Sequence, residues 1–110
     1  MQKLEFVVEG SKGDEYKILF EREGNNLDVF CTCAAGENGL YCKHRFALMN
    51  GDVSALLSEN ENDVTALKEL MKGTDVEVAY DDVMSLQAQY DEINARLKAA
   101  KKVLAKAMYR

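Results

Sequence analysis

The most constraining feature of this sequence is a cluster of four metal-ligand residues, spaced as Cys-x-Cys, eight residues, then Cys-x-His. The cluster comprises Cys31, Cys33, Cys42 and His44, which are all the cysteines and the only histidine among 110 residues. In an extended Cys-x-Cys both side chains point to the same face, and the loop lets the chain return with the second pair. Three thiolates and one imidazole suit Zn²⁺ in a tetrahedron.

Four protein ligands leave no coordination position for water or a substrate, which is typical of a structural zinc site. A redox role for Cys-x-Cys is an alternative, but it assigns no role to Cys42 and His44. Buried cysteines that merely fill space are another alternative, and it leaves the grouping of all four residues within 14 positions unexplained. We therefore predict a bound Zn²⁺ and no small-molecule substrate. Because the only histidine and all the cysteines are assigned to the metal, we also predict that the protein is not an enzyme.

The first third of the chain predicts a small antiparallel sheet. Apolar residues alternate with polar ones over about residues 3–9, 15–22 and 27–32, and segments rich in Gly, Asn and Asp separate these strands. The third strand delivers the first two ligands. A short helix is expected from about residue 42 to residue 50, because Gly51 follows as a stop signal.

The residues around the cluster resemble the SWIM zinc finger, a family defined by Cys-x-Cys, a variable loop and Cys-x-His. The similar stretches are residues 27–33 and 41–48, and the resemblance extends over about residues 27–50. It implies a β-hairpin or strand pair followed by a helix, with the four cluster residues as ligands. Fingers of this family are generally proposed to bind DNA or proteins.

Several residues beside the ligands have two interpretations. We expect Phe30, Phe46 and Leu48 to pack the finger against the first two strands, since apolar residues beside a small metal site usually form its core. An exposed aromatic platform for bases is the alternative. Lys43 and Arg45 bracket His44, and we expect a solvated surface pair or neutralisation of the thiolate-rich site, with a contact for phosphate as the alternative.

The middle of the chain predicts short helices. Asp52 can cap a helix over residues 53–57, and Asn62 or Asp63 can cap another over residues 64–72. Gly73 is expected to end the second of these helices. Residues 74–80 alternate briefly and predict an extended segment.

The last segment carries the strongest helical signal, because its apolar residues step by three and four from Val83 to Leu104. We expect a helix over about residues 82–108, about 40 Å long. Its stripe is long enough for a two-helix coiled coil, although packing over the chain's own core is the alternative. The residues assigned to self-association are Leu86, Tyr90, Ile93, Leu97 and Leu104.

Charge is distributed unevenly along the chain. Residues 1–93 hold 8 Lys and Arg against 19 Asp and Glu, whereas residues 94–110 hold 6 basic residues and no acidic one. The net charge of −5 opposes binding through phosphate contacts, while the basic tail favours it. The basic residues assigned to contact with nucleic acid or a partner are Lys43, Arg45, Arg96, Lys98, Lys101, Lys102 and Lys106.

Together these features predict an α+β protein, in which a three-stranded antiparallel sheet leads into a zinc finger with a short helix. Further helices follow and end in one long amphipathic C-terminal helix. We expect three segments: residues 1–52 with sheet and finger, residues 53–80 with short helices and a connector, and residues 81–110 with the long helix.

The predicted function is a zinc-binding interaction or adaptor module for protein–protein association, with a protein partner or a second copy bound through the C-terminal helix. Nucleic-acid binding through the finger and the basic tail is the alternative. No apolar run reaches the roughly 20 residues that span a bilayer, so no membrane contact is expected. The odd number of cysteines, three, which cannot all pair within one chain, and the lack of a signal-peptide pattern predict a cytoplasmic protein.

Overall fold

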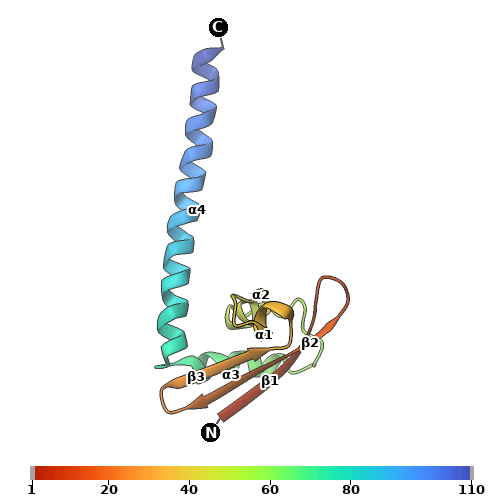
Figure 1. The fold of residues 1–110 in the computed structure, drawn as a ribbon. Coiled ribbons are helices and arrows are strands. Elements are labelled where there is room, and N and C mark those ends of the chain that lie inside the picture. The colour runs from red at the N-terminus through yellow and green to blue at the C-terminus, as the bar shows by residue number, and fades with distance from the viewer. Residues whose placement is uncertain (1, 110) are drawn as a thin grey trace. The chain divides into compact units, whose positions relative to one another are not determined.

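The computed structural model describes residues 2–109. It divides into two compact units, Met1–Glu77 and Val78–Arg110, each of which is described by itself. The elements in chain order are β1 (Gln2–Glu9), β2 (Glu15–Glu23), β3 (Asn26–Cys31), α1 (Ala34–Glu37), α2 (Lys43–Met49), α3 (Glu61–Met71) and α4 (Asp75–Met108) (Figure 1). The predicted α+β class, with a three-stranded antiparallel sheet and a long C-terminal helix, is confirmed.

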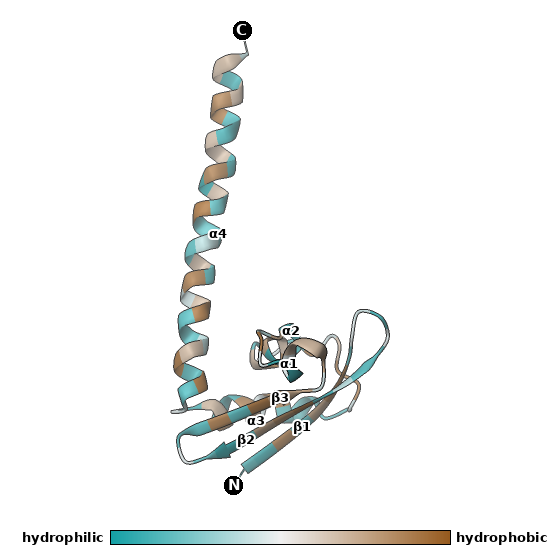
Figure 2. Ribbon diagram, viewed as in Figure 1, coloured by the Kyte–Doolittle hydropathy of each residue, from teal (hydrophilic) through white to brown (hydrophobic). Residues whose placement is uncertain are grey.

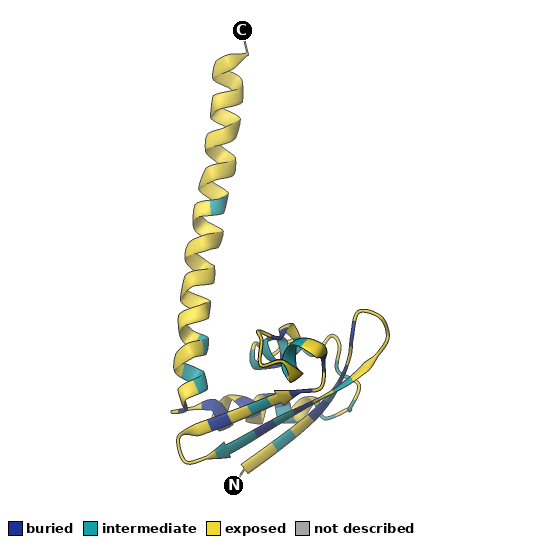
Figure 3. Ribbon diagram, in the orientation of Figure 1, coloured by how far each residue is buried: buried dark blue, intermediate teal, exposed yellow. Residues whose placement is uncertain are grey.

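The sheet has the order β1-β2-β3, and its neighbouring strands are antiparallel. Phe6 lies opposite Ile18, and Ile18 lies opposite Cys31, so the apolar alternation of all three strands falls on one face. That face is buried, and the rings of Phe6 and Phe20 meet edge-on there with centroids 5.8 Å apart. The strands alternate between buried and exposed residues (Figure 3), and β3 carries Cys31 into the buried layer.

Two helices complete the core of the first unit. Helix α3 packs against β1, α2 packs against β3, and the two helices contact each other. The buried residues of these helices are Leu48, Val64, Leu67, Leu70 and Met71. Those of α3 recur at the spacing of one helix face. Helix α2 is therefore held by both the sheet and α3, which fixes the backbone around Cys42 and His44.

The predicted helix over residues 53–57 is wrong. This segment forms a turn and then an isolated bridge between Leu56 and Val8. The Glu9 N–H donates to the Ala55 carbonyl at 2.9 Å, and the Leu57 N–H donates to the Val7 carbonyl at 2.8 Å. Without this segment, backbone N–H and C=O groups at the outer edge of β1 would lack hydrogen-bond partners. Pairing with them stabilises an extended segment, whereas a helix of only five residues has little stability of its own.

The predicted extended segment over residues 74–80 is also wrong, because α4 begins at Asp75, seven residues before the expected start. Thr74 caps it: the Glu77 N–H donates to the Thr74 hydroxyl at 3.2 Å, and the Glu77 carboxylate accepts from the Gly73 N–H at 3.1 Å. Thr-x-x-Glu is the sequence signature of a capping box, and it predicts a helix start at this point. The alternation of apolar residues over 74–80 predicts a strand instead, and the structure follows the capping signature.

The structure differs from the expectation at two further places. Helix α3 begins at Glu61 rather than at residue 64, because the Asn60 amide bonds the Glu5 carbonyl and the Asp63 carboxylate and so fixes the entry to the helix. The expected stop at Gly73 is confirmed, since this residue has a φ of +79° directly after the helix. Residues 34–37, expected as loop, form the short helix α1.

Helix α4 contains 34 residues and is about 51 Å long. Apolar residues recur along its length (Figure 2), yet no residue from 78 to 109 is buried (Figure 3). Among residues 2–109 no helix is long and apolar enough to cross a membrane.

Candidate metal centre

The four predicted ligand residues converge at the point where β3, α1 and α2 meet. Their ligand atoms all lie within 4.8 Å of one another. The Sγ atoms of Cys33 and Cys42 are 3.3 Å apart, and the Nδ1 atom of His44 lies 3.6 Å from Cys42 Sγ and 4.0 Å from Cys31 Sγ. With bonds of about 2.3 Å, the edges of a zinc–thiolate tetrahedron are about 3.8 Å. The separations therefore fit one Zn²⁺ shared by all four side chains.

The backbone of β3 orients the first pair of ligands. The Thr32 N–H donates to the Lys17 carbonyl at 3.1 Å, and the Lys17 N–H donates to the Thr32 hydroxyl at 2.9 Å. These two bonds keep the chain extended through Thr32 and turn its side chain away from the cluster. Cys31 and Cys33 therefore share the buried face, with exposed fractions of 4% and 5%.

The second pair of ligands is set by the start of α2. Cys42 is the N-cap residue, with an extended backbone, and its carbonyl accepts the Phe46 N–H at 3.2 Å. His44 lies in the first turn, and its ring packs against Tyr16 with centroids 5.0 Å apart. The ring of Tyr16 in turn lies against Gly10, where an added Cβ would be 2.4 Å from the ring. Gly10 thus leaves room for the ring that supports His44.

The donor chemistry of the cluster fits zinc. Among the described residues, the hydrogen-bonding contacts of the His44 ring are with sulfur atoms, and its Nε2 is buried without a partner. The protein's own hydrogen bonds therefore do not account for the placement of this ring, whereas a metal ion bound at Nδ1 does.

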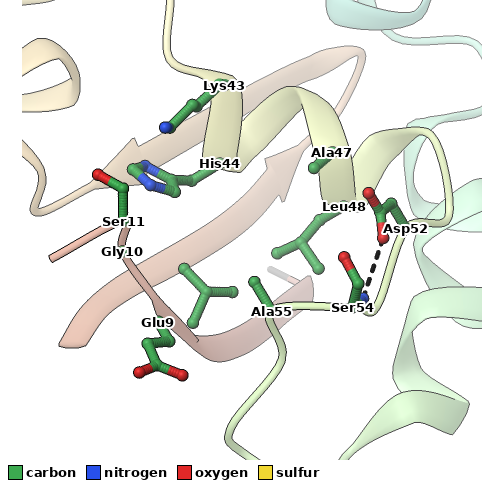
Figure 4. Close-up of a pocket in the computed structure, with 11 residues that line it drawn as sticks. Glu9, Gly10, Ser11, Lys43, His44, Ala47, Leu48, Asp52, Ser54 and Ala55 are labelled. Atoms are coloured by element: carbon green, nitrogen blue, oxygen red, sulfur yellow. Dashed lines mark hydrogen bonds between the residues drawn. The ribbon is translucent and has the colours of Figure 1, made fainter. Parts of the chain in front are cut away.

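A cavity of about 440 Å³ lies beside the cluster, between α2, the end of β1 and residues 52–55 (Figure 4). His44 and Lys43 are among the residues that line it.

The thiols differ in their tendency to ionise. Burial raises the pKa of Cys31 to about 12, so this thiol is protonated at neutral pH unless a metal displaces the proton. Burial also acts to raise the pKa of Cys42, but hydrogen bonds from the backbone N–H groups of Arg45 and His44, together with the neighbouring thiols, outweigh it and lower the pKa. Cys42 therefore ionises more readily than Cys31.

Arg45 connects three segments around the metal centre through hydrogen bonds that no sequence pattern predicts. Its guanidinium donates to the Val29 carbonyl of β3 at 2.9 Å and to the Leu40 carbonyl of the loop at 2.5 Å. It therefore links the strand, the loop and α2 around the ligands. Lys43 is exposed at the start of α2, while the five other basic residues assigned to contact lie exposed on α4, in the second unit.

The expected packing beside the ligands is only partly correct. Leu48 is buried and Phe46 is half-buried, with its ring 5.7 Å from that of Tyr41. The expectation is wrong for Phe30, which is 54% exposed. Strand alternation places Phe30 on the open face of the sheet, opposite to Cys31. The alternation of β3 by itself predicts an exposed side chain at this position.

Gly36 is a second residue that sequence reasoning missed. An added Cβ would lie 2.5 Å from the carbonyl oxygen of Cys31 and 2.8 Å from its Cβ, both in the ligand-bearing strand. The Gly36 N–H also donates to Cys33 Sγ at 3.3 Å. Only a glycine lets α1 approach the cluster this closely.

We expect Gly36→Ala to lower the stability of the zinc-loaded protein by about 1–3 kcal/mol, because the methyl group must displace backbone atoms of Cys31. Gly39→Asn is the control, since this position has open space and a φ of +70°, which asparagine tolerates. Zinc affinity and thermal unfolding of both variants test the prediction. A Gly36→Ala protein that matches the control in both measurements would show that the close approach is unimportant.

The SWIM zinc finger family model matches residues 6–50. No curated protein and no solved structure matches the chain. The matched range contains all four clustered residues and extends from within β1 to the end of α2. The predicted resemblance is confirmed, and the family match together with the Cys₃His cluster supports Zn²⁺ as the cofactor.

Proposed function

Because the chain carries a SWIM zinc finger over residues 6–50, we propose that it is a non-catalytic association module that binds protein through the apolar face of α4. In this proposal the zinc ion stabilises the first unit, and the second unit makes the contact. The observation that carries the proposal is the exposure of large apolar side chains on α4. Ile93 is 62% exposed and Leu97 is 49% exposed, and they lie on a stripe spaced by three and four residues.

The composition of the metal centre supports a non-catalytic role. His44 and the three cysteines, which are the usual acid–base and nucleophilic groups, all belong to the cluster. With four protein ligands, the ion has no position left for a substrate. In this proposal the ion stabilises the fold of the finger and does not act on a substrate.

Charge supports protein over nucleic acid as the partner. The first unit is acidic, and Arg45, one of two basic residues beside the ligands, is bound to backbone carbonyls. The five basic residues of α4 lie between Arg96 and Lys106, and Lys106 in the last turn also complements the negative end of the helix dipole. Nucleic-acid binding through this basic end is the alternative function.

The test compares two double variants of the zinc-loaded protein. Ile93→Lys with Leu97→Lys places two charges on the apolar face, and the control, Ala95→Lys with Ala99→Lys, adds the same charges at the same spacing on another face. We expect light scattering to show a mass above the 12.3 kDa of one chain for the parent and the control. The first variant should have the mass of one chain.

A DNA titration at about 50 and 150 mM salt separates the two functions. DNA binding that persists at the higher salt, in a protein that is monomeric and unaffected by the change at Ile93 and Leu97, would contradict the proposal. It would favour the nucleic-acid alternative.

A further inference from the structure

We infer that the apolar face of α4 binds a second copy of this chain, with the two α4 helices side by side and antiparallel. The inference rests on the proposed function and specifies both the partner and its direction. Three properties of α4 carry it: the length of its apolar stripe, the distribution of its charges, and the order of large and small residues along the stripe.

The apolar stripe extends over almost the whole of α4. It continues the predicted stripe in both directions, and its steps of three and four hold throughout. Its members are Val76, Ala79, Val83, Leu86, Tyr90, Ile93, Leu97, Ala100, Leu104 and Ala107. The 34 residues of the helix amount to nearly five heptads, more than the three or four that indicate a coiled coil. We call this set the α4 seam.

The charges of α4 are segregated along its length. Residues 75–95 contain 6 acidic residues and no basic one, and residues 96–108 contain 5 basic residues and no acidic one. In a fully overlapped antiparallel pair, the four acidic residues between 75 and 82 lie beside the basic residues 96–108 of the other helix, and Asp91 and Glu92 of both copies lie together at the centre. The interaxial distance is about 8–10 Å, comparable with the screening length at physiological salt. A parallel pair would instead set acid beside acid and base beside base.

The sizes of the seam residues favour the same direction. When two copies of α4 overlap fully and run antiparallel, Asp75 of one lies beside Met108 of the other, and each seam residue faces a seam residue. The facing pairs are Val76–Ala107, Ala79–Leu104, Val83–Ala100, Leu86–Leu97 and Tyr90–Ile93. Every alanine then faces a larger side chain, so the layers have similar volumes. In a parallel pair each alanine would face another alanine and Tyr90 would face Tyr90, which leaves gaps and a bulge.

Photocrosslinking of the full-length, zinc-loaded protein tests the direction. We would replace Tyr80, which lies next to the seam near the start of α4, by p-benzoylphenylalanine, and map crosslinks in a mixture of ¹⁵N-labelled and unlabelled chains. An antiparallel pair predicts a covalent dimer of twice 12.3 kDa, joined to residues near 97–104 of the other copy. The same photocrosslinker at Lys101 is the reciprocal site and should reach residues near 76–84 of the other copy.

Each outcome decides the question. Crosslinks from both sites to the expected residues of the other copy support the inference. Crosslinks from position 80 to residues near 76–84 of the other copy show a parallel pair, which overturns the direction but leaves the proposed association. Products confined to one chain, in a protein with the mass of one chain, show that α4 does not bind a second copy; they overturn the inference, whereas the proposed association would then require a different protein as the partner.

Discussion

Removal of zinc is expected to abolish the cooperative unfolding transition of the first unit. Cys31, Cys33 and Cys42 are buried where the sheet meets α1 and α2, and Cys33 also caps α1. Without the metal, the three thiols and the Nδ1 atom of His44 lose the ion that accounts for their convergence. Zinc contributes roughly 10–16 kcal/mol in finger peptides, which equals or exceeds the roughly 5–15 kcal/mol of total stability of a small domain. Thermal melts followed by near-ultraviolet circular dichroism, with and without a chelator, measure the loss.

Substitution of one ligand should have the same effect without a chelator. We expect His44→Ala to reduce the zinc content and to lower the melting temperature sharply. Lys43→Ala is the matched control, because Lys43 lies between Cys42 and His44 and is exposed. A His44→Ala protein with the zinc content and melting temperature of the control would contradict the assignment of this ligand.

Phe20→Ala is expected to lower the free energy of unfolding by about 3–5 kcal/mol, because it leaves a cavity in the core. Phe20 has an exposed fraction of 0% and meets Phe6 at 88° between the ring planes. Phe30→Ala removes the same atoms from a side chain that is 54% exposed, and its cost should stay below about 1 kcal/mol. Denaturant titrations of the two zinc-loaded variants compare these costs directly.

The comparison of the two phenylalanines tests which face of the sheet is the core. Equal losses, or a larger loss for Phe30→Ala, would mean that the open face is covered in solution. That result would identify the face with Phe30 as an interface and would contradict the described burial of the sheet.

The local chemistry of this protein is readable from its sequence. The Cys-x-Cys and Cys-x-His pairs need only strand geometry and a return loop, so their convergence was predicted and the four side chains do meet. The same holds for the three strands, whose alternation of apolar residues is a local pattern. The start of α4 at Asp75 was missed although its capping box was present, because two local signals competed at residues 74–80.

Features that depend on distant contacts were not predictable in the same way. Residues 53–57 are not helical because they pair with the edge of β1, some 48 residues earlier in the chain. The role of Arg45 depends on two carbonyls that only the folded chain brings within its reach. The need for glycine at position 36 arises from its approach to Cys31, a tertiary contact that leaves no pattern in the sequence.

X-ray absorption at the zinc edge, combined with metal analysis of the purified protein, tests the central claim most directly. We expect one zinc per chain, bound to three sulfur atoms at about 2.3 Å and one nitrogen at about 2.0–2.1 Å. This result would show that Cys31, Cys33, Cys42 and His44 form a closed structural site. A spectrum with fewer than three sulfur ligands, with a bound water oxygen, or without stoichiometric zinc would contradict it.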